Sequence, residues 1–150
     1  MNPRKIGRCA PFHAAVLSTL HGRCFDETWE EAALTRLLAM PGAFAFLAEE
    51  DASPTGFILC RGAGDECEVI SLAVLPGFRR KGVATALLAR ALDEAGKGGV
   101  KKIFLEVAED NAAGRSFYEA LKFEAVGRRE KYYKSTAGER RDALIMAYEF

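Results

Sequence analysis

One stretch of the chain, residues 69–92, restricts the possible folds more than any other. Its first part, 69–75, is almost wholly apolar, and a Pro76-Gly77 turn and the basic loop Arg79-Arg80-Lys81-Gly82 follow it. Leucine and alanine then recur at helical spacing. This order predicts a buried strand, a glycine loop and an amphipathic helix, so the fold must pack a helix against the sheet that contains the strand.

The loop in this stretch has the chemistry of an anion site. The first N–H groups of a helix have no intrahelical acceptor, and the helix dipole places positive charge beside them. Gly82 and Ala84 are small, so a pyrophosphate can approach the backbone closely. Positive charge at the mouth comes from Arg79, Arg80 and Lys81. A basic surface turn before an ordinary helix would have the same sequence, so the loop alone leaves both interpretations open.

Length and charge limit the class of protein. The chain has 150 residues, which fits one domain over 1–150, with 21 basic and 21 acidic residues. A nucleic-acid-binding protein would normally have a basic excess, so no direct nucleic-acid partner is expected. Because no apolar stretch is long enough for a membrane span or a secretory signal, we expect a cytoplasmic protein with no membrane contact.

The cysteines give no sign of a metal site. Cys9, Cys24, Cys60 and Cys67 are scattered without metal-ligand spacing, so we expect free thiols in a reducing compartment and no bound metal. Cys60 and Cys67 could lie close together on paired strands, but the sequence does not require a disulfide there.

The remaining periodicities predict an α+β domain with a mixed sheet. Three strands in succession, joined by short turns, predict an antiparallel meander, and strand–helix–strand units in the second half predict parallel pairing there. Helices should cover both faces of the sheet. The expected helices are 11–20, a helix from a Thr28 cap to Met40, 82–95 and 112–121; the expected strands are 43–49, 55–61, 66–75, 102–107, 123–132 and 143–150.

A second informative stretch begins with the strand Ile103-Phe104-Leu105-Glu106-Val107. Strand alternation places Phe104 and Glu106 on one face, and a carboxylate in so apolar a strand must be solvated, paired or used chemically. Asn111 is placed to cap the next helix, and Tyr118 lies off the apolar stripe of that helix, toward a sheet edge or cleft. A water-facing Glu106, an Asn111 that only caps and a Tyr118 at the core boundary stay open as simpler interpretations.

Together these residues resemble the GCN5-related N-acetyltransferases (GNAT). The resemblance rests on Arg79-x-x-Gly82-x-Ala84, on Leu105-Glu106-Val107, on Asn111 and on Tyr118, twelve residues after Glu106. It is strongest for the RimI-like branch, which acetylates the N-terminal alanine of a small-subunit ribosomal protein. It extends from about Cys24 to Tyr148. The departures are small: Ala84 and Lys122 stand where the family often has glycine, and Gly114 is expected to weaken its helix slightly.

The resemblance implies a fold, a co-substrate and a mechanism. It implies a GNAT fold with a central mixed sheet of about six to seven strands and about four helices. Glu106 would be the general base and Tyr118 the general acid, with acetyl-CoA as co-substrate. The residues implied in acetyl-CoA binding are Leu72, Ala73, Val74, Arg79, Arg80, Lys81, Gly82, Val83, Ala84, Thr85 and Asn111. The acceptor would be a protein N-terminus, and the enzyme a monomer or weak homodimer.

Two other functions fit the same residues. A small amine such as a polyamine, an antibiotic or an amino acid could be the acceptor, or the domain could bind CoA without turnover. Tyr132 and Tyr133 fit either ordinary strand positions or a loop beside the acceptor groove. Phe25 and Trp29 are expected in the core, and His13 and His21 as ordinary helix residues.

Overall fold

The computed structural model describes residues 4–27, 29–134 and 140–150. The described residues form seven strands and four α-helices, with short 3-10 turns at Pro11–His13 and Pro76–Phe78. The helices are α1 (Ala14–Cys24), α2 (Glu31–Ala39), α3 (Val83–Lys97) and α4 (Ala112–Ala120). The strands are β1 (Arg4–Arg8), β2 (Ala43–Glu50), β3 (Ser53–Ala63), β4 (Glu66–Val74), β5 (Lys102–Ala108), β6 (Glu124–Lys134) and β7 (Arg140–Glu149).

All seven strands form one mixed sheet in the order β1-β2-β3-β4-β5-β7-β6. Neighbouring strands are antiparallel except β4 and β5, which are parallel because α3 carries the chain back across the sheet between them. The α+β class, the mixed sheet and the β2–β3–β4 meander are therefore confirmed. The parallel pairing expected in the second half is confirmed for β4 and β5, whereas β5 and β6 do not pair, because β7 inserts antiparallel between them.

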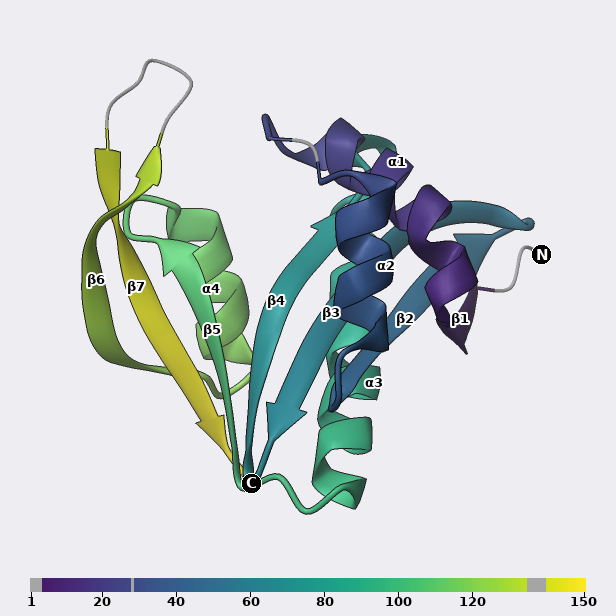
Figure 1. Ribbon diagram of the computed structural model, residues 1–150. Helices are drawn as coiled ribbons and strands as arrows, with labels where there is room; N and C mark the ends of the chain where they lie inside the picture. Colours follow the sequence, from purple (N-terminus) through teal and green to yellow (C-terminus); the bar gives the residue numbers. More distant parts are fainter. Residues whose placement is uncertain (1–3, 28, 135–139) are drawn as a thin grey trace.

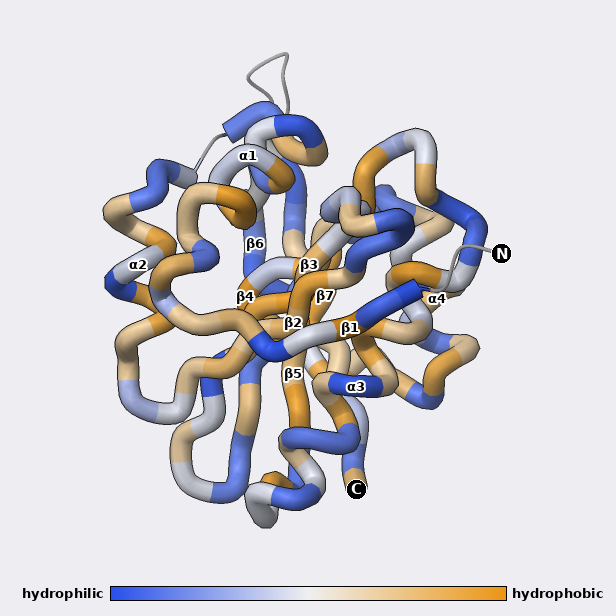
Figure 2. The backbone as a smooth tube through the Cα atoms, turned by 90° about the vertical axis from the view of Figure 1, so that its right-hand side faces the viewer, coloured by the Kyte–Doolittle hydropathy of each residue, from blue (hydrophilic) through white to orange (hydrophobic). Residues whose placement is uncertain are grey.

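Strand alternation divides the core between the two faces of the sheet. On one face, Phe46 of β2 and Ile58 of β3 lie in the same buried cluster as Leu87 and Leu88 of α3. Their neighbours along β2 and β3 face α1 and α2. The middle strands are apolar on both faces because helices cover both, as expected. Figure 2 shows the hydrophobic stretches gathered along these central strands, with hydrophilic stretches at the periphery.

The parallel pair β4–β5 separates soon after it begins. The two strands pair only at Glu66–Lys102, Cys67–Ile103 and Glu68–Phe104. Beyond this point they diverge, and Figure 1 shows β4 leaning toward α1 and α2 while β5 stays with α4, β6 and β7. As a result, the ends of β4 and β5, which carry the predicted site residues, stand apart.

Strand β1 is the element that the sequence analysis missed. It pairs with β2 at the edge of the sheet, yet Ile6 is its one large apolar side chain, so it lacks the pattern of a buried strand. The helix predicted to begin at a Thr28 cap begins instead at Glu31, with Glu30 as its N-cap; Thr28 itself lies outside the described residues. Among the described residues, no helix combines the length and the apolar character of a membrane span.

Candidate active site

The diverging ends of β4 and β5 border a cleft of about 1310 Å³. Its walls come from β4, the loop after it, the first turn of α3, β5 and α4, and the end of α1 closes one side. Most of the predicted site residues line this cleft: Leu72, Ala73, Val74, Arg79, Arg80, Gly82, Val83, Ala84, Thr85, Glu106, Asn111 and Tyr118. The structure thus brings together two sequence segments that local patterns had indicated separately.

The first turn of α3 presents backbone donors to the cleft. Gly82 is the N-cap and has φ +83°, a left-handed conformation that favours glycine. The Ala86 N–H donates to the Gly82 carbonyl at 3.0 Å as the first helical bond. The N–H groups of Val83, Ala84 and Thr85 precede that bond, so they have no acceptor within the helix. This arrangement fits a pyrophosphate and therefore fits CoA.

The three basic residues before Gly82 lie in different environments. Arg79 donates from Nε to the Val74 carbonyl at 2.9 Å, so its side chain ties the loop to the end of β4. Arg80 lines the cleft with φ +61°. Lys81 differs from the other predicted residues because it does not line the cleft; its Nζ lies 5.6 Å from the ring centroid of Phe78.

Glu106 is largely buried between the cleft and a smaller hollow. Its side chain is 17% exposed, and its Oε1 lies 2.9 Å from Arg129 Nη2 of β6. The hollow, of about 380 Å³, shares Glu68, Leu105 and Glu106 with the cleft. Burial raises the pKa of Glu106; the Arg129 charge lowers it and the Glu68 charge raises it, but burial is the largest effect. The carboxylate therefore lies at the border of the cleft, paired with Arg129, and is not at a fully exposed strand end.

Tyr118 reaches the same cleft from α4. Its ring centroid is 5.1 Å from that of Phe117 and 5.7 Å from that of Phe123, both at steep interplanar angles. Phe123 is buried at 2% exposure, so one side of the Tyr118 ring is anchored to the core while the residue lines the cleft.

Asn111 caps α4 as predicted. Its Oδ1 accepts from the Gly114 N–H at 3.0 Å. Gly114 has little room for a side chain, because a Cβ there would lie 2.6 Å from Asn111 Nδ2 and 3.1 Å from Val107 Cγ2. Both Asn111 and Gly114 line the cleft, so this cap is part of its wall.

Aromatic side chains at the end of α1 form a part of the cleft that sequence reasoning missed. The buried His21 stacks on Trp29 with ring centroids 4.3 Å apart, and Phe25 lies 4.6 Å from His21. Phe25 is 43% exposed, so its expected place in the core is wrong. The spacing of His21, Phe25 and Trp29 in the sequence matches ordinary core positions, so nothing in the sequence distinguishes these cleft residues from core residues. The side chains of Tyr132 and Tyr133 lie outside the described residues.

Of the four cysteines, Cys24 lines the cleft beside Arg79, whereas Cys9, Cys60 and Cys67 do not line it. All four are free, and the thiols of Cys60 and Cys67 lie close enough to form a hydrogen bond, which raises the pKa of Cys60 and lowers that of Cys67. In the described part of the chain, no group of three or more potential metal ligands gathers.

Comparison with known proteins agrees with this geometry. The pattern of the acetyltransferase (GNAT) family matches residues 14–123. The chain is 37% identical over 102 residues to the [ribosomal protein bS18]-alanine N-acetyltransferase of Escherichia coli K12, covering 68% of each protein. It is 35% identical over 92 residues to the enzyme of the same name from Haemophilus influenzae, covering 61% of this chain and 62% of that protein.

Solved structures give the same result for the whole fold. The crystal structure of the ribosomal-protein-S18-alanine N-acetyltransferase from Escherichia coli superposes with a TM-score of 0.91 at 28% identity, covering 98% of this chain and 94% of that one. Arabidopsis thaliana NAA60 in complex with acetyl-CoA superposes with a TM-score of 0.84 at 17% identity, covering 99% of both chains, which shows a shared fold. The chain therefore belongs to the acetyltransferase (GNAT) family.

Proposed function

We propose that this protein transfers the acetyl group of acetyl-CoA to the N-terminal α-amine of a small-subunit ribosomal protein that begins with alanine. One observation carries the proposal: Glu106 of β5 and Tyr118 of α4 line the same cleft as the pyrophosphate-binding turn of α3. The names of the Escherichia coli and Haemophilus influenzae relatives support this choice of acceptor.

Glu106 acts as the general base in this proposal. An α-amine has a pKa near 8, about two units below that of a lysine amine, so a modest base can remove its proton at neutral pH. Burial raises the pKa of Glu106 and so makes the carboxylate a stronger base than an exposed glutamate. The Arg129 contact at 2.9 Å orients the carboxylate and favours its ionised form, the form that accepts a proton.

Attack on the thioester creates an oxyanion and then a thiolate, which backbone N–H groups and Tyr118, respectively, stabilise and protonate. Acetyl-CoA supplies the activated thioester, and no covalent intermediate on the protein is required. Since β4 pairs with β5 only up to Glu68, the backbone N–H groups of Leu72–Val74 that face the cleft can stabilise the tetrahedral oxyanion. Tyr118, held on Phe123, donates a proton to the leaving thiolate.

A single assay tests both the acceptor and the mechanism. CoA release is measured with a short alanine-starting peptide, with the same peptide blocked at its α-amine, and with a polyamine. We expect turnover of the free peptide only. Turnover of the polyamine alone would move the acceptor to small amines, and turnover of none with CoA still bound would favour a binding domain.

Two substitutions then test the catalytic roles. Glu106→Gln and Tyr118→Phe should each lower kcat by about 10²- to 10⁴-fold with the free peptide. The matched control is Glu109→Gln, because Glu109 is a half-buried carboxylate just beyond β5 that pairs with Arg128 and does not line the cleft. An unchanged rate in both site variants would contradict the assigned roles.

A further inference from the structure

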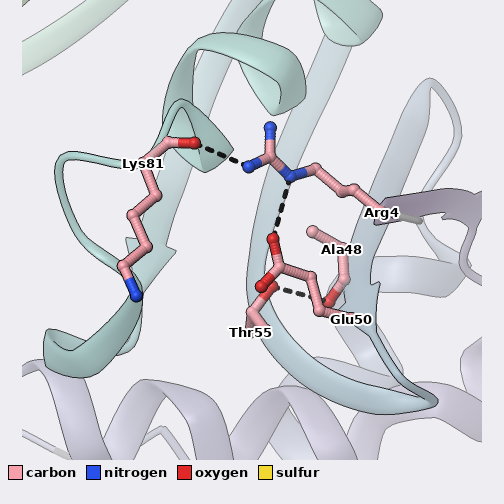
Figure 3. A network of polar contacts seen from close by, with 5 residues as sticks. All are labelled: Arg4, Ala48, Glu50, Thr55 and Lys81. Carbon is pink, nitrogen blue, oxygen red and sulfur yellow. Dashed lines mark hydrogen bonds and ion pairs between the residues drawn. The ribbon is translucent and has the colours of Figure 1, made fainter. Parts of the chain in front are cut away.

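The missed strand β1 contacts the pyrophosphate-binding loop. Arg4, the first residue of β1, donates from Nη2 to the Lys81 carbonyl at 2.6 Å, although the two residues are 77 positions apart in the sequence. Its Nε lies 3.3 Å from Glu50 Oε1 on the paired strand β2. Figure 3 shows the Arg4 guanidinium between the Glu50 carboxylate and the Lys81 carbonyl.

The beginning of the loop is held from the same end of the sheet. Thr55 is wholly buried, and its carbonyl accepts from the Leu75 N–H at 2.8 Å. The Thr55 hydroxyl donates to the Ala48 carbonyl at 3.3 Å, beside the register shift between Ala48 and Glu49. The segment between Leu75 and Lys81 is thus fixed at one end by a backbone bond and at the other by Arg4.

Fixing the Lys81 carbonyl also fixes the next peptide N–H. In a trans peptide the C=O of one residue and the N–H of the next point in opposite directions. Since the Lys81 carbonyl is turned to Arg4, the Gly82 N–H is turned away from Arg4. Gly82 lines the cleft and Lys81 does not, which is consistent with that N–H belonging to the cleft side.

The backbone here needs external support. Arg80 and Gly82 both have positive φ, at +61° and +83°, and for Arg80 this conformation is unfavourable by itself. A charge-assisted bond to the intervening Lys81 carbonyl stabilises the strained loop. In addition, Arg4 Nη1 lies 3.5 Å from the place of a Cβ on Gly82, so its positive charge is close to the N-cap of α3.

We infer that Arg4 is a positioning residue for CoA: it holds the loop so that the N–H groups at Gly82 and the first turn of α3 face the pyrophosphate. This inference rests on the proposed use of acetyl-CoA. A different role, in which Arg4 only joins the edge strand to β2 through Glu50, would leave CoA affinity unaffected. The two roles differ in what they predict for ligands with and without a pyrophosphate.

The test compares Arg4→Gln with Arg8→Gln. Arg8 is the matched control because it lies on the same strand and pairs at 2.7 Å with Glu94, a residue of α3 remote from the loop. Calorimetry with CoA should give a Kd about tenfold higher for Arg4→Gln, the loss of one charge-assisted bond, and an unchanged Kd for Arg8→Gln. With saturating acetyl-CoA, kcat of Arg4→Gln should stay near the wild-type value while KM for acetyl-CoA rises.

S-acetylpantetheine, which has no pyrophosphate, separates positioning from general damage. Its kcat/KM should be the same in Arg4→Gln and wild type; an equal loss for both donors, or an unchanged Kd for CoA, overturns the inference. Arg4→Lys gives a second measurement if Arg4→Gln does not fold. A lysine keeps the charge but cannot reach both oxygens in the same geometry, so a weakened CoA affinity supports positioning and a wild-type affinity overturns it.

The outcomes for the two proposals are distinguishable. If the wild-type protein binds CoA but does not acetylate the alanine peptide, the choice of acceptor fails while the Arg4 comparison still decides the inference. If it acetylates the peptide and Arg4→Gln binds CoA normally, only the inference fails. If the wild-type protein binds no CoA, both are overturned.

Discussion

Gly114 offers a sharp test of the cleft wall, because sequence and structure predict opposite effects of Gly114→Ala. From sequence alone, replacing a helical glycine by alanine should stabilise the protein by up to about 1 kcal/mol. In the structure, the added Cβ would lie 2.6 Å from Asn111 Nδ2 and 3.1 Å from Val107 Cγ2. The Asn111 side chain must then rotate and give up its bond to the Gly114 N–H.

Three contributions determine how much Gly114→Ala changes the free energy of unfolding. Loss of the cap costs about 1 kcal/mol, crowding against Val107 costs about 1–3 kcal/mol, and helix propensity returns at most about 1 kcal/mol. We therefore expect a net destabilisation of about 1–4 kcal/mol. In a chain of this size each kcal/mol lowers Tm by about 2–4 °C, which urea or thermal unfolding resolves easily.

Gly96→Ala in α3 is the matched control. A Cβ at Gly96 would meet ring atoms of Phe150 at 3.3 Å, and Phe150 is 50% exposed and can move aside. This variant should be neutral or stabilised by up to about 1 kcal/mol. A double-mutant cycle completes the test: in an Asn111→Ala background, Gly114→Ala should cost about 1 kcal/mol less. A Gly114→Ala variant more stable than wild type, or an equal cost in both backgrounds, would refute the reasoning.

Three further predictions concern titrating groups. Arg129 lowers and Glu68 raises the pKa of Glu106, so the acid limb of kcat/KM should move to higher pH in Arg129→Gln and to lower pH in Glu68→Gln; shifts in the same direction would contradict the assignment. Burial raises the folded-state pKa of Glu106 above its ordinary value of 4.5, so this group's contribution to stability is lost as pH rises; Glu106→Gln should therefore gain stability relative to wild type as pH rises above that ordinary value, measured by urea unfolding. Burial raises the pKa of Cys9 to about 12, so iodoacetamide at about pH 8 should leave Cys9 unmodified in the folded protein and alkylate it in urea, as read by mass spectrometry.

The parts of the site that are local in sequence could be predicted. A strand, a glycine loop and a helix follow one another without interruption, so the turn at Gly82 that begins α3 is visible in the sequence. The alternation of side chains along β5 correctly predicted that Glu106 lies on the face opposite to the buried Ile103, Leu105 and Val107. The cap at Asn111 is also a local property, and the structure contains it.

The contacts that depend on strand order could not be predicted. Arg129 reaches Glu106 only because β7 lies between β5 and β6, and no local pattern encodes that order. Arg4 reaches Lys81 from an edge strand with one large apolar residue, so neither the strand nor its contact was expected. Phe25 looked like a core residue because hydrophobicity alone does not distinguish a core side chain from one at the mouth of a cleft.

The early separation of β4 from β5 has a consequence for how an enzyme of this architecture can diversify. The proposed pyrophosphate site belongs to β4 and α3, whereas Glu106 and its partner Arg129 belong to β5 and β6, and the strands of the two halves are joined at only three residue pairs. Substitutions that reshape the second half therefore need not disturb the backbone donors of the first. Such a division allows acceptor preference to change over evolutionary time, or in the hands of a protein engineer, while the same activated donor is retained.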